Sequence, residues 1–252
     1  MTLSLDHHLE RTLRTLRLSG IADSLEVRLD QARSSSLGYM DFLHTILQDE
    51  VERRKARSLQ RRIKQAHFNE QKALEDFDFS ALPGVNHKQI KDLATGIYIE
   101  KTENIILYGP PGTGKTHLAQ ALGNQACRSD HTVRFITASK LYRQFAQARI
   151  HNDHANAMKE VLKPKLLIID DFGLSSLEHE QAHDLYEVVA ERHNRGSIII
   201  TSNRPPGDWL DLFPDPVMAN SLMDRLAHRA HHIAMKGESF RKRLSPERRN
   251  QQ

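Results

Sequence analysis

Apolar side chains in the first part of the chain recur at intervals of three and four residues, the spacing of one face of an α-helix. These positions form two sets, Leu9, Leu13 and Leu16, then Ile21, Leu25 and Leu29. Gly20 is expected to interrupt the chain between the two helices. The serines at 34–36 mark a second break, and a longer helix is predicted from about Gly38 to Phe68. Residues 1–76 are therefore predicted to form a small all-helical domain.

The long predicted helix changes character along its length. Its first half is amphipathic, with apolar residues at Phe42, Leu43, Ile46, Leu47 and Val51. Its second half holds a run of basic side chains without one acid, namely Arg53, Arg54, Lys55, Arg57, Arg61, Arg62 and Lys64. A solvated helix face would explain such a run, and so would a surface that binds a polyanion.

From Phe77 onward, short β-branched runs alternate with helical stretches. Strands are predicted at Asn104–Tyr108, Val133–Thr137, Leu166–Asp170 and Ser197–Ser202, with one more short strand near Ile233. Helices are predicted near 115–128, 139–150 and 179–195, and again after Trp209. This alternation is typical of an α/β domain, here residues 77–252, in which a parallel sheet is flanked by helices.

Composition narrows the class of protein. The longest strongly apolar runs are about four residues, far below the roughly 20 needed to span a bilayer. The chain has a single cysteine, Cys127, which excludes an intrachain disulfide framework and fits a reducing cytoplasm. We expect Cys127 to lie on a buried helix face. The net charge of +4 comes from the tail, since residues 225–252 hold 8 basic and 2 acidic side chains.

The segment after the first predicted strand matches the phosphate-binding P-loop pattern G-x-x-x-x-G-K-[ST] at every required position. It consists of Gly109, Pro110, Pro111, Gly112, Thr113, Gly114, Lys115 and Thr116. The glycines allow backbone N–H groups to face the β- and γ-phosphates of ATP, and the following helix adds the positive end of its dipole. We expect Lys115 to neutralise phosphate oxygens and Thr116 to offer its hydroxyl to Mg²⁺.

A magnesium–nucleotide site also needs a carboxylate at the end of a neighbouring strand. Asp170 and Asp171 directly follow the apolar run Leu166–Ile169. Asp170 is expected to hold Mg²⁺ through its water shell, and Asp171 to orient or deprotonate the attacking water. Capping of a following helix is the alternative role, which the nearby P-loop makes weaker.

Three further polar residues are candidates for the same chemistry. Asn203 ends the strand Ser197–Ser202 and could position the lytic water, although a turn before the two prolines would also explain it. Arg225 and Arg241 could each stabilise the charge of the phosphoryl-transfer transition state. Their positions in the sequence do not show which of the two has this role.

Taken together, five sequence blocks resemble the IstB-like ATPases, the AAA+ transposition helpers of bacterial insertion sequences, which are related to the DnaC-type helicase loaders. The blocks are NIILYGPPGTGKTHLAQA at 104–121, LLIIDDFG at 166–173, TSNRPPGDW at 201–209, DRLAH at 224–228 and GESFR at 237–241. The resemblance covers about residues 77–243 in order, and the N-terminal helices fit it more loosely. It implies an AAA+ core and an ATP-dependent homo-oligomer that binds duplex target DNA and recruits or stimulates a transposase.

The resemblance also implies roles for single residues. It assigns nucleotide binding to residues 109–116, Mg²⁺ and hydrolysis roles to Asp170 and Asp171, and the sensor-1 position to Asn203. Arg225 resembles an arginine finger that acts on a neighbouring subunit, and Arg241 the second sensor.

Two residues depart from the pattern of the superfamily. Asp171 stands where many AAA+ proteins have Glu, and its shorter side chain could slow hydrolysis. Phe240 stands where Tyr is common, which removes one hydroxyl.

The best candidates for DNA contact are the basic run from Arg53 to Lys64 and the block Arg241–Arg243. Lys140 and Arg143, on the helix after Ser139, could line the inner surface of an oligomer. Phosphate contacts of this kind predict binding that is strongly salt-dependent and independent of sequence.

Other functions and roles stay open from the sequence. A loader of a replicative helicase could have the same catalytic residues. A small-molecule P-loop kinase is a further alternative, but no sequence signature of an acceptor site stands out. A DNA clamp could also bind ATP and hydrolyse it only slowly. Trp209 is expected to be a packing anchor rather than a base-stacking platform. His228, His231 and His232 are expected at a polar helix edge or near phosphate, because no further ligand completes a zinc spacing.

Overall fold

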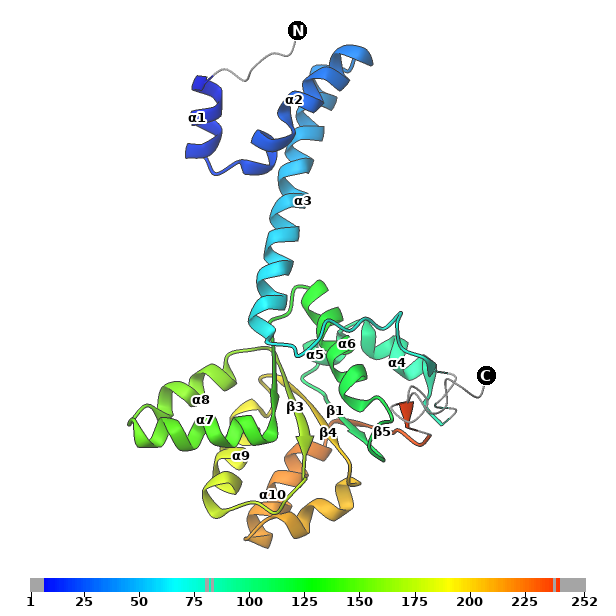
Figure 1. Cartoon of the computed structure of the whole chain (residues 1–252), viewed down its shortest axis with the longest axis vertical. Coiled ribbons are helices and arrows are strands. Elements are labelled where there is room, and N and C mark those ends of the chain that lie inside the picture. Colours follow the sequence, from blue (N-terminus) through cyan, green and yellow to red (C-terminus); the bar gives the residue numbers. More distant parts are fainter. Residues whose placement is uncertain (1–6, 80–81, 83, 238, 241–252) are drawn as a thin grey trace, which may run out of the picture. The chain divides into compact units, whose positions relative to one another are not determined.

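The computed structural model describes residues 7–79, 82, 84–237 and 239–240. These residues form two compact units that divide between Arg61 and Arg62 (Figure 1). The helix α3 (Tyr39–Ala66) runs through this division. None of the described helices is long and apolar enough to cross a membrane.

The N-terminal unit is all-helical, as predicted. It contains α1 (His7–Thr15), α2 (Ser19–Ser34) and most of α3. Leu13, Ile21 and Leu25 are buried between the helices, and Phe42 and Ile46 of α3 pack against them. The helical spacing of the sequence therefore predicted only part of these apolar contacts. Other apolar residues of the predicted faces are exposed, namely Leu9, Leu16, Leu43, Leu47 and Val51.

The expected role of Gly20 is wrong. The chain turns before it, where Arg17 adopts a left-handed backbone with φ of 57°, and Gly20 lies inside the first turn of α2. A Cβ on Gly20 would stand 2.8 Å from the Cα of Glu50. Glycine is required here because α3 passes close to α2, not because the helix ends.

A buried carboxylate joins these two helices. Glu50 of α3 is only 5% exposed and accepts hydrogen bonds from the backbone amides of Gly20 (2.6 Å) and Ile21 (3.3 Å). Arg54 donates a further bond of 2.6 Å to the same side chain. Glu50 thus satisfies amides at the N-terminus of α2, where a negative charge is stabilised by the helix dipole.

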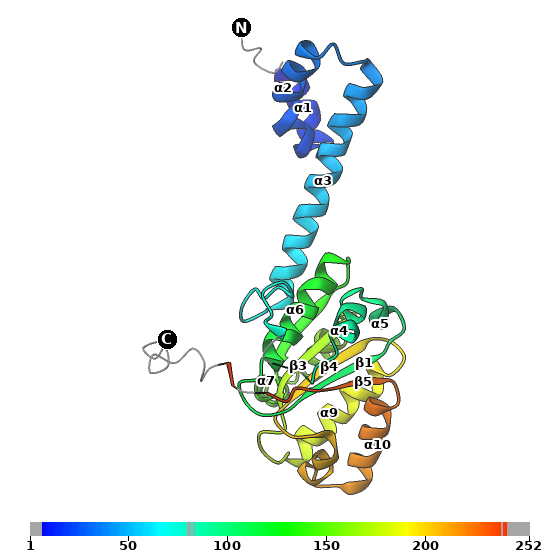
Figure 2. The same cartoon turned by 90° about the vertical axis from the view of Figure 1, so that its right-hand side faces the viewer.

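The larger unit is an α/β fold built on a five-stranded parallel sheet, as predicted. Its strands are β1 (Asn104–Tyr108), β2 (Val133–Thr137), β3 (Leu166–Phe172), β4 (Ser197–Ser202) and β5 (Ala230–Ala234). They lie in the order β2-β3-β4-β1-β5, so β5 lies beside β1 at one edge (Figure 2). The four main predicted strands are confirmed, with β3 extending two residues further than expected.

Helices cover both faces of this sheet. They are α4 (His87–Ala94), α5 (Ile97–Glu100), α6 (Lys115–Arg128), α7 (Ala138–Ile150), α8 (His154–Leu162), α9 (His179–Arg192), the 3-10 helix η2 (Pro206–Leu212) and α10 (Pro216–Ala227). Side chains of α7 to α10 share one core with Ile106, Leu167 and Ile200. The helix α6 packs on β3, where a Cβ on Gly123 would stand 2.7 Å from Ile168 Cδ1. The helices α4, α5 and α8 were not predicted from the sequence.

The segment between α3 and α4 groups with the larger unit, so the units divide earlier than the change in sequence pattern near Phe77. Arg62 donates a 2.9 Å hydrogen bond to the carbonyl of Cys127 and pairs with Asp130 at 2.6 Å. The backbone amide of Glu70 donates to the side chain of Gln120. These polar contacts with α6 are long-range and leave no local signal in the sequence.

Candidate functional site

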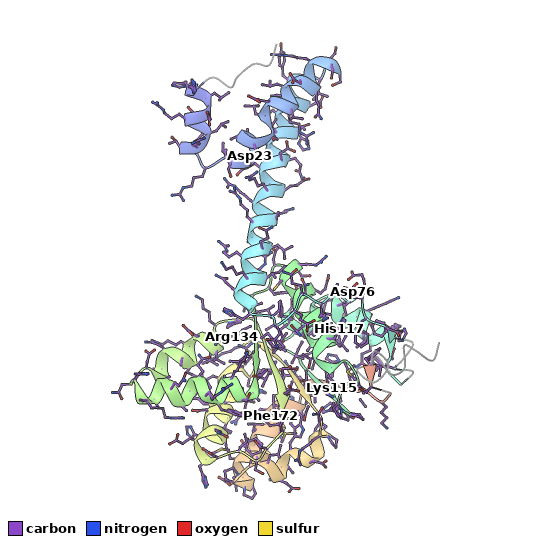
Figure 3. All side chains as sticks on the ribbon, in the orientation of Figure 1. Asp23, Asp76, Lys115, His117, Arg134 and Phe172 are labelled. Atoms are coloured by element: carbon purple, nitrogen blue, oxygen red, sulfur yellow. The ribbon has the colours of Figure 1, made fainter. Side chains whose placement is uncertain are left out.

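The P-loop connects β1 to α6, the strand and helix that the sequence predicted around it. Gly109, Gly112 and Gly114 have positive φ of 145°, 85° and 86°, values that side-chain-bearing residues rarely adopt. Lys115 opens α6 and is 6% exposed (Figure 3). Its Nζ donates to the carbonyls of Gly109 (2.8 Å) and Pro110 (2.7 Å), so the ammonium lies against the curved loop.

The same glycines also allow a second segment to cross the loop. The chain after β5 continues beside β1, where the amide of Met235 donates to Tyr108 O at 2.7 Å, and the amide of Phe240 donates to Gly112 O at 2.9 Å. A Cβ on Gly109 would stand 2.3 Å from Met235 O, and one on Gly112 would stand 2.1 Å from Ser239 Oγ. Residues 239–240 therefore lie directly against the P-loop, which the sequence motif did not reveal.

Asp170 lies at the carboxyl end of β3 and is 2% exposed. Its Oδ1 accepts hydrogen bonds from Thr116 Oγ1 (2.9 Å) and Thr201 Oγ1 (2.6 Å). Burial raises the pKa of Asp170, as does the charge of Asp171, while the two hydroxyls and Lys115 act in the opposite direction. Thr116 and Asp170 thus supply adjacent hard oxygen atoms, the donor type that suits Mg²⁺.

The expectation that the acidic strand neighbours the P-loop strand is wrong by one position. The strand β4 lies between β1 and β3 in the sheet. Asp170 still reaches Thr116 because α6 passes over the sheet from the end of β1 and contacts β3. Chain order alone does not reveal the order of strands in a parallel sheet.

Asp171 is exposed and has a left-handed backbone with φ of 56°. Regular pairing between β3 and β4 is interrupted at this point, between Ile169 and Phe172. The amide of Asp171 donates a 2.9 Å hydrogen bond to Thr201 Oγ1. Thr201 bonds to both members of the acidic pair, and sequence reasoning missed it because a threonine in an apolar run reads as an ordinary strand residue.

Asn203 directly follows β4 and is half-buried. Because the strands are parallel and β4 lies between β1 and β3, this residue, the P-loop and the two aspartates lie at the same edge of the sheet. The strand that precedes Asn203, β4, pairs directly with β1, the strand that leads into the P-loop.

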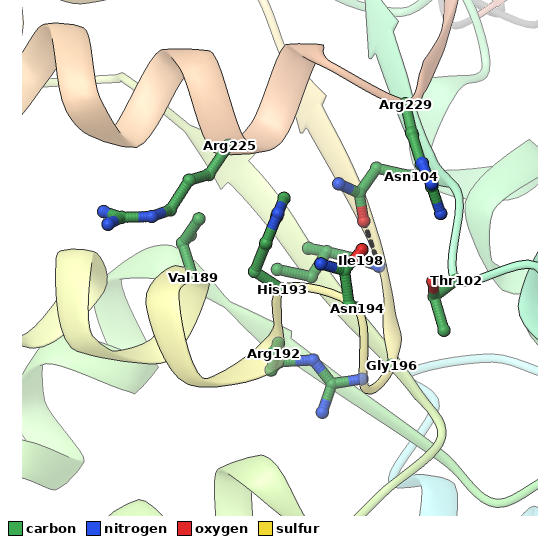
Figure 4. Close-up of a pocket in the computed structure, with 10 residues that line it drawn as sticks. All are labelled: Thr102, Asn104, Val189, Arg192, His193, Asn194, Gly196, Ile198, Arg225 and Arg229. Atoms are coloured by element: carbon green, nitrogen blue, oxygen red, sulfur yellow. Dashed lines mark hydrogen bonds between the residues drawn. The ribbon is translucent and has the colours of Figure 1, made fainter.

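Arg225 lies on α10, away from this edge. Its Nη1 donates to Ser221 Oγ at 3.0 Å, and its guanidinium lies 5.0 Å from the centroid of the Tyr186 ring. The pocket that it lines includes Asn104 and Ile198, near the amino ends of β1 and β4 (Figure 4). That pocket lies at the amino end of β1, whereas the P-loop follows its carboxyl end, roughly 13 Å further along the strand at about 3.3 Å per residue. Arg241 lies outside the described residues.

Some of the basic side chains in the run on α3 are held by other residues of the protein, and others are exposed. Arg53 pairs with Asp23, Arg54 with Glu50, and Arg57 donates to Ser19 Oγ at 2.7 Å, all within the N-terminal unit. The Arg62 side chain is 12% exposed and is held by Asp130 and Cys127 O, so it would have to leave these partners to reach a phosphate. The exposed cations that remain in the run are Lys55, Arg61 and Lys64. Lys140 and Arg143 are exposed on α7.

Three smaller expectations have clear outcomes. Trp209 is fully buried, stacks edge-on against Phe172 and donates to Arg204 O at 3.1 Å, so it is a packing residue as predicted. Cys127 is buried on α6, also as predicted. His231 and His232 lie on β5 rather than at a helix edge, and His231 contacts Glu103 at 2.8 Å.

Comparisons with known proteins agree with this geometry. The sequence pattern of the family described as IstB-like ATP binding protein matches residues 11–248. A protein of Mycobacterium tuberculosis, provisionally named as an ATP-binding protein in an insertion sequence, is 41% identical over 244 residues and covers 96% of this chain and 97% of its own length.

Solved structures support the fold. The DnaC helicase loader matches 59% of this chain and 87% of its own, with a TM-score of 0.53 and 21% identity. AMPPCP-bound DnaA from Aquifex aeolicus matches 68% of this chain and 51% of its own, with a TM-score of 0.57 and 22% identity. At this level of identity, these structures show a shared fold and nothing further.

Proposed function

The chain belongs to the family of IstB-like ATP-binding proteins, and from this premise we propose that it is an ATP-dependent, DNA-binding helper of an insertion-sequence transposase. The observation that carries the proposal is the Thr116–Asp170 pair beside an intact P-loop, in a chain related over nearly its whole length to an insertion-sequence protein. The small-molecule kinase hypothesis has no comparable support.

ATP binding is assigned to residues 109–116. The positive-φ glycines curl the loop so that its backbone amides could surround phosphate oxygens, and Lys115 would exchange its two loop carbonyls for those oxygens. Thr116 and Asp170 would hold Mg²⁺, which when bound neutralises charge on the phosphates. The hydrogen bonds from Thr116 and Thr201 hold the carboxylate of Asp170 in place for this role.

Hydrolysis is assigned to the residues that follow β3 and β4. Asp171 is exposed next to the buried Asp170 and would orient or deprotonate the attacking water, with Asn203 as a second polar contact. The left-handed backbone of Asp171 suits aspartate, which tolerates this region better than most residues. The presence of Asp rather than Glu thus has a conformational reason in this chain.

Assembly is assigned to the face that carries Arg225. Arg225 lines a pocket at the amino ends of β1 and β4, whereas the P-loop follows the carboxyl end of β1, so we assign its transition-state role to the nucleotide of a second copy. ATP bound at such an interface would favour the homo-oligomer, and hydrolysis would favour its release. We assign DNA contact to Lys55, Arg61 and Lys64 on α3 and to Lys140 and Arg143 on α7, which would track phosphates of duplex DNA.

The proposal is tested with three proteins, the wild type, Lys115→Ala and Arg225→Ala, by measuring ATP hydrolysis with and without duplex DNA and the oligomer size with ATP. The wild type should show turnover stimulated by duplex and ATP-dependent assembly on it. Lys115→Ala should lose nucleotide binding, whereas Arg225→Ala should bind nucleotide normally and turn over about 10³-fold more slowly. The matched control is Arg195→Ala, because Arg195 is exposed and pairs with Glu191 at the end of α9. This variant should behave like the wild type.

The outcomes separate the proposed helper from its alternatives. Stimulation of strand transfer by the transposase of the same insertion element would complete the case for a helper. ATP turnover without any binding to duplex would reject the helper and direct the search for a partner to a replicative helicase. ATP-dependent assembly on duplex without turnover would identify a weakly hydrolysing DNA clamp instead.

A further inference from the structure

The last two residues of β4, Thr201 and Ser202, are hydroxyl side chains with no exposed surface. They lie opposite the irregular part of β3, where Ile169 pairs with Ile200 and the next regular pair is Phe172 with Ser202. Two residues of β3, Asp170 and Asp171, therefore face one residue of β4. This is the arrangement of a β-bulge, which breaks the ladder of backbone hydrogen bonds.

Both hydroxyls bond to backbone groups at or beside the bulge. Thr201 Oγ1 accepts from the amide of Asp171 at 2.9 Å and donates to Asp170 Oδ1 at 2.6 Å. Ser202 Oγ accepts from the amide of Arg204 at 3.1 Å and donates to Phe172 O at 2.8 Å. Since an amide can only donate, the proton of each hydroxyl is free for the oxygen on its other side.

The Thr201 hydroxyl consequently acts on both acids. It supplies an acceptor for the amide of Asp171, whose left-handed backbone would otherwise leave that group without its strand partner. Its proton, together with that of Thr116, is directed to Oδ1 of Asp170, which leaves Oδ2 as the oxygen available to a hydrated cation. No other described hydroxyl bonds to both residues.

We propose that Thr201 is a positioning residue of the ATPase site, one that fixes the carboxylate of Asp170 and the backbone of Asp171 through a single hydroxyl. This inference rests on the proposed ATPase function and adds to it a buried residue of β4 that acts through the two aspartates. It requires that the hydroxyl, rather than the volume of the side chain, be needed for turnover.

The test compares Thr201→Val, which keeps the shape and removes the hydroxyl, with Thr201→Ser, which keeps the hydroxyl. Ser197→Ala is the matched control, because Ser197 lies at the other end of the same strand, is equally buried and donates its hydroxyl to Tyr98 O at 3.2 Å. Turnover, KM for ATP, the Mg²⁺ concentration for half-maximal rate and thermal stability are measured for each full-length protein.

Thr201→Val should lower kcat about 10- to 100-fold and raise the Mg²⁺ requirement, as loss of an orienting hydrogen bond does in metal sites. Fluorescent-nucleotide affinity measured in EDTA should stay within about twofold of the wild type, because the P-loop is untouched. Thr201→Ser should recover most of the rate, and Ser197→Ala should leave kcat unchanged. Wild-type kcat in Thr201→Val, or an equal loss of kcat in Ser197→Ala, would overturn the proposal.

Failure of the ATPase function itself can be told apart. If the wild type binds nucleotide but does not hydrolyse it, the Mg²⁺-dependent gain in nucleotide affinity replaces kcat as the readout. Loss of that gain in Thr201→Val, with its retention in Thr201→Ser, would still support the positioning role. An undiminished gain in Thr201→Val would reject it.

Discussion

The N-terminal unit and the larger unit hold their helices in place by different means. In the larger unit, one apolar core extends from the strands β1, β3 and β4 to the helices α7 to α10. In the described part of the N-terminal unit, the core cluster has only three buried residues, Leu13, Ile21 and Leu25. Charged side chains supply further long-range contacts there, since Glu50 accepts from the amides at the start of α2, Arg28 pairs with Asp49 and Arg53 pairs with Asp23.

This difference follows from size. A unit of about 60 residues buries a smaller fraction of its apolar surface than a larger one, so each additional anchor is a larger share of its stability. A carboxylate that satisfies helix amides in a buried position supplies such an anchor. The stability of the larger unit should therefore fall most when a buried apolar side chain is truncated. The stability of the N-terminal unit should fall most when a buried charge is removed.

The largest effect is expected for Phe145→Ala in the larger unit. Phe145 is fully buried in α7, and its truncation leaves a cavity that should cost about 3–5 kcal/mol of the free energy of unfolding. Trp209 is the only tryptophan and lies in the same core, so its fluorescence reports the unfolding of this unit in urea. Hydrogen exchange of peptides from α1 and α2 should not change.

Ile150→Ala is the matched control, because Ile150 ends the same helix and is 78% exposed. Its unfolding curve should lie within about 0.5 kcal/mol of the wild type. Equal destabilisation by both substitutions would show that volume in this core is not what distinguishes the larger unit.

The same contrast explains what the sequence could predict. In the larger unit the runs at Asn104–Tyr108 and Ser197–Ser202 are apolar and β-branched because these strands are buried on both faces, and their predicted limits match the structure. The P-loop is a local motif, so its position was equally clear. The place of β4 between β1 and β3, and the bulge that makes Thr201 a partner of Asp171, depend on strand pairing and have no local signature.

In the N-terminal unit the sequence located the helices but gave the wrong reason for one residue. Gly20 reads as a helix breaker, whereas its small size is needed because Glu50, thirty residues later, passes against it. The acidic partners of the basic run were also hidden, since the pairing of Arg53 with Asp23 depends on how α2 and α3 pack. Long-range polar contacts are the part of this fold that periodicity does not encode.

A smaller effect is expected for Glu50→Gln in the N-terminal unit. Glutamine keeps the shape but removes the charge and has only one acceptor oxygen, so either the bond from Arg54 or the two bonds from the α2 amides are lost, which should cost about 1–3 kcal/mol. Hydrogen exchange of the α2 peptides should accelerate, while Trp209 fluorescence should report an unchanged larger unit. Glu10→Gln, which removes an exposed pair with Arg14, should leave exchange as it is in the wild type. Unchanged protection of α2 in Glu50→Gln would mean that the buried charge is not an anchor.

The smallest effect is a dependence of the N-terminal unit on acid. Burial acts to raise the pKa of Glu50, but hydrogen bonds from Arg54 and the amides of Gly20 and Ile21 outweigh it and hold the pKa below its ordinary value of 4.5. The hydrogen bond from Arg28 likewise lowers the pKa of Asp49 from 3.8. Both groups bind protons more weakly in the folded state, so their stabilisation is complete above these ordinary values and is lost as the pH falls through the lower folded ones.

This acid dependence can be separated from general acid unfolding by comparing the wild type with Glu50→Gln. The melting temperature of the N-terminal unit is followed by circular dichroism in both proteins from about pH 6 to pH 3, and Trp209 fluorescence marks the larger unit. Ordinary carboxylates titrate between about pH 3 and 6. The difference in melting temperature between the wild type and Glu50→Gln should therefore shrink as the pH falls. Protonation of Glu50 removes in the wild type the same charge that the substitution removes at every pH. A difference that stays constant across this range would show that Glu50 acts through its shape rather than its charge, and the two units would then differ less than their contacts indicate.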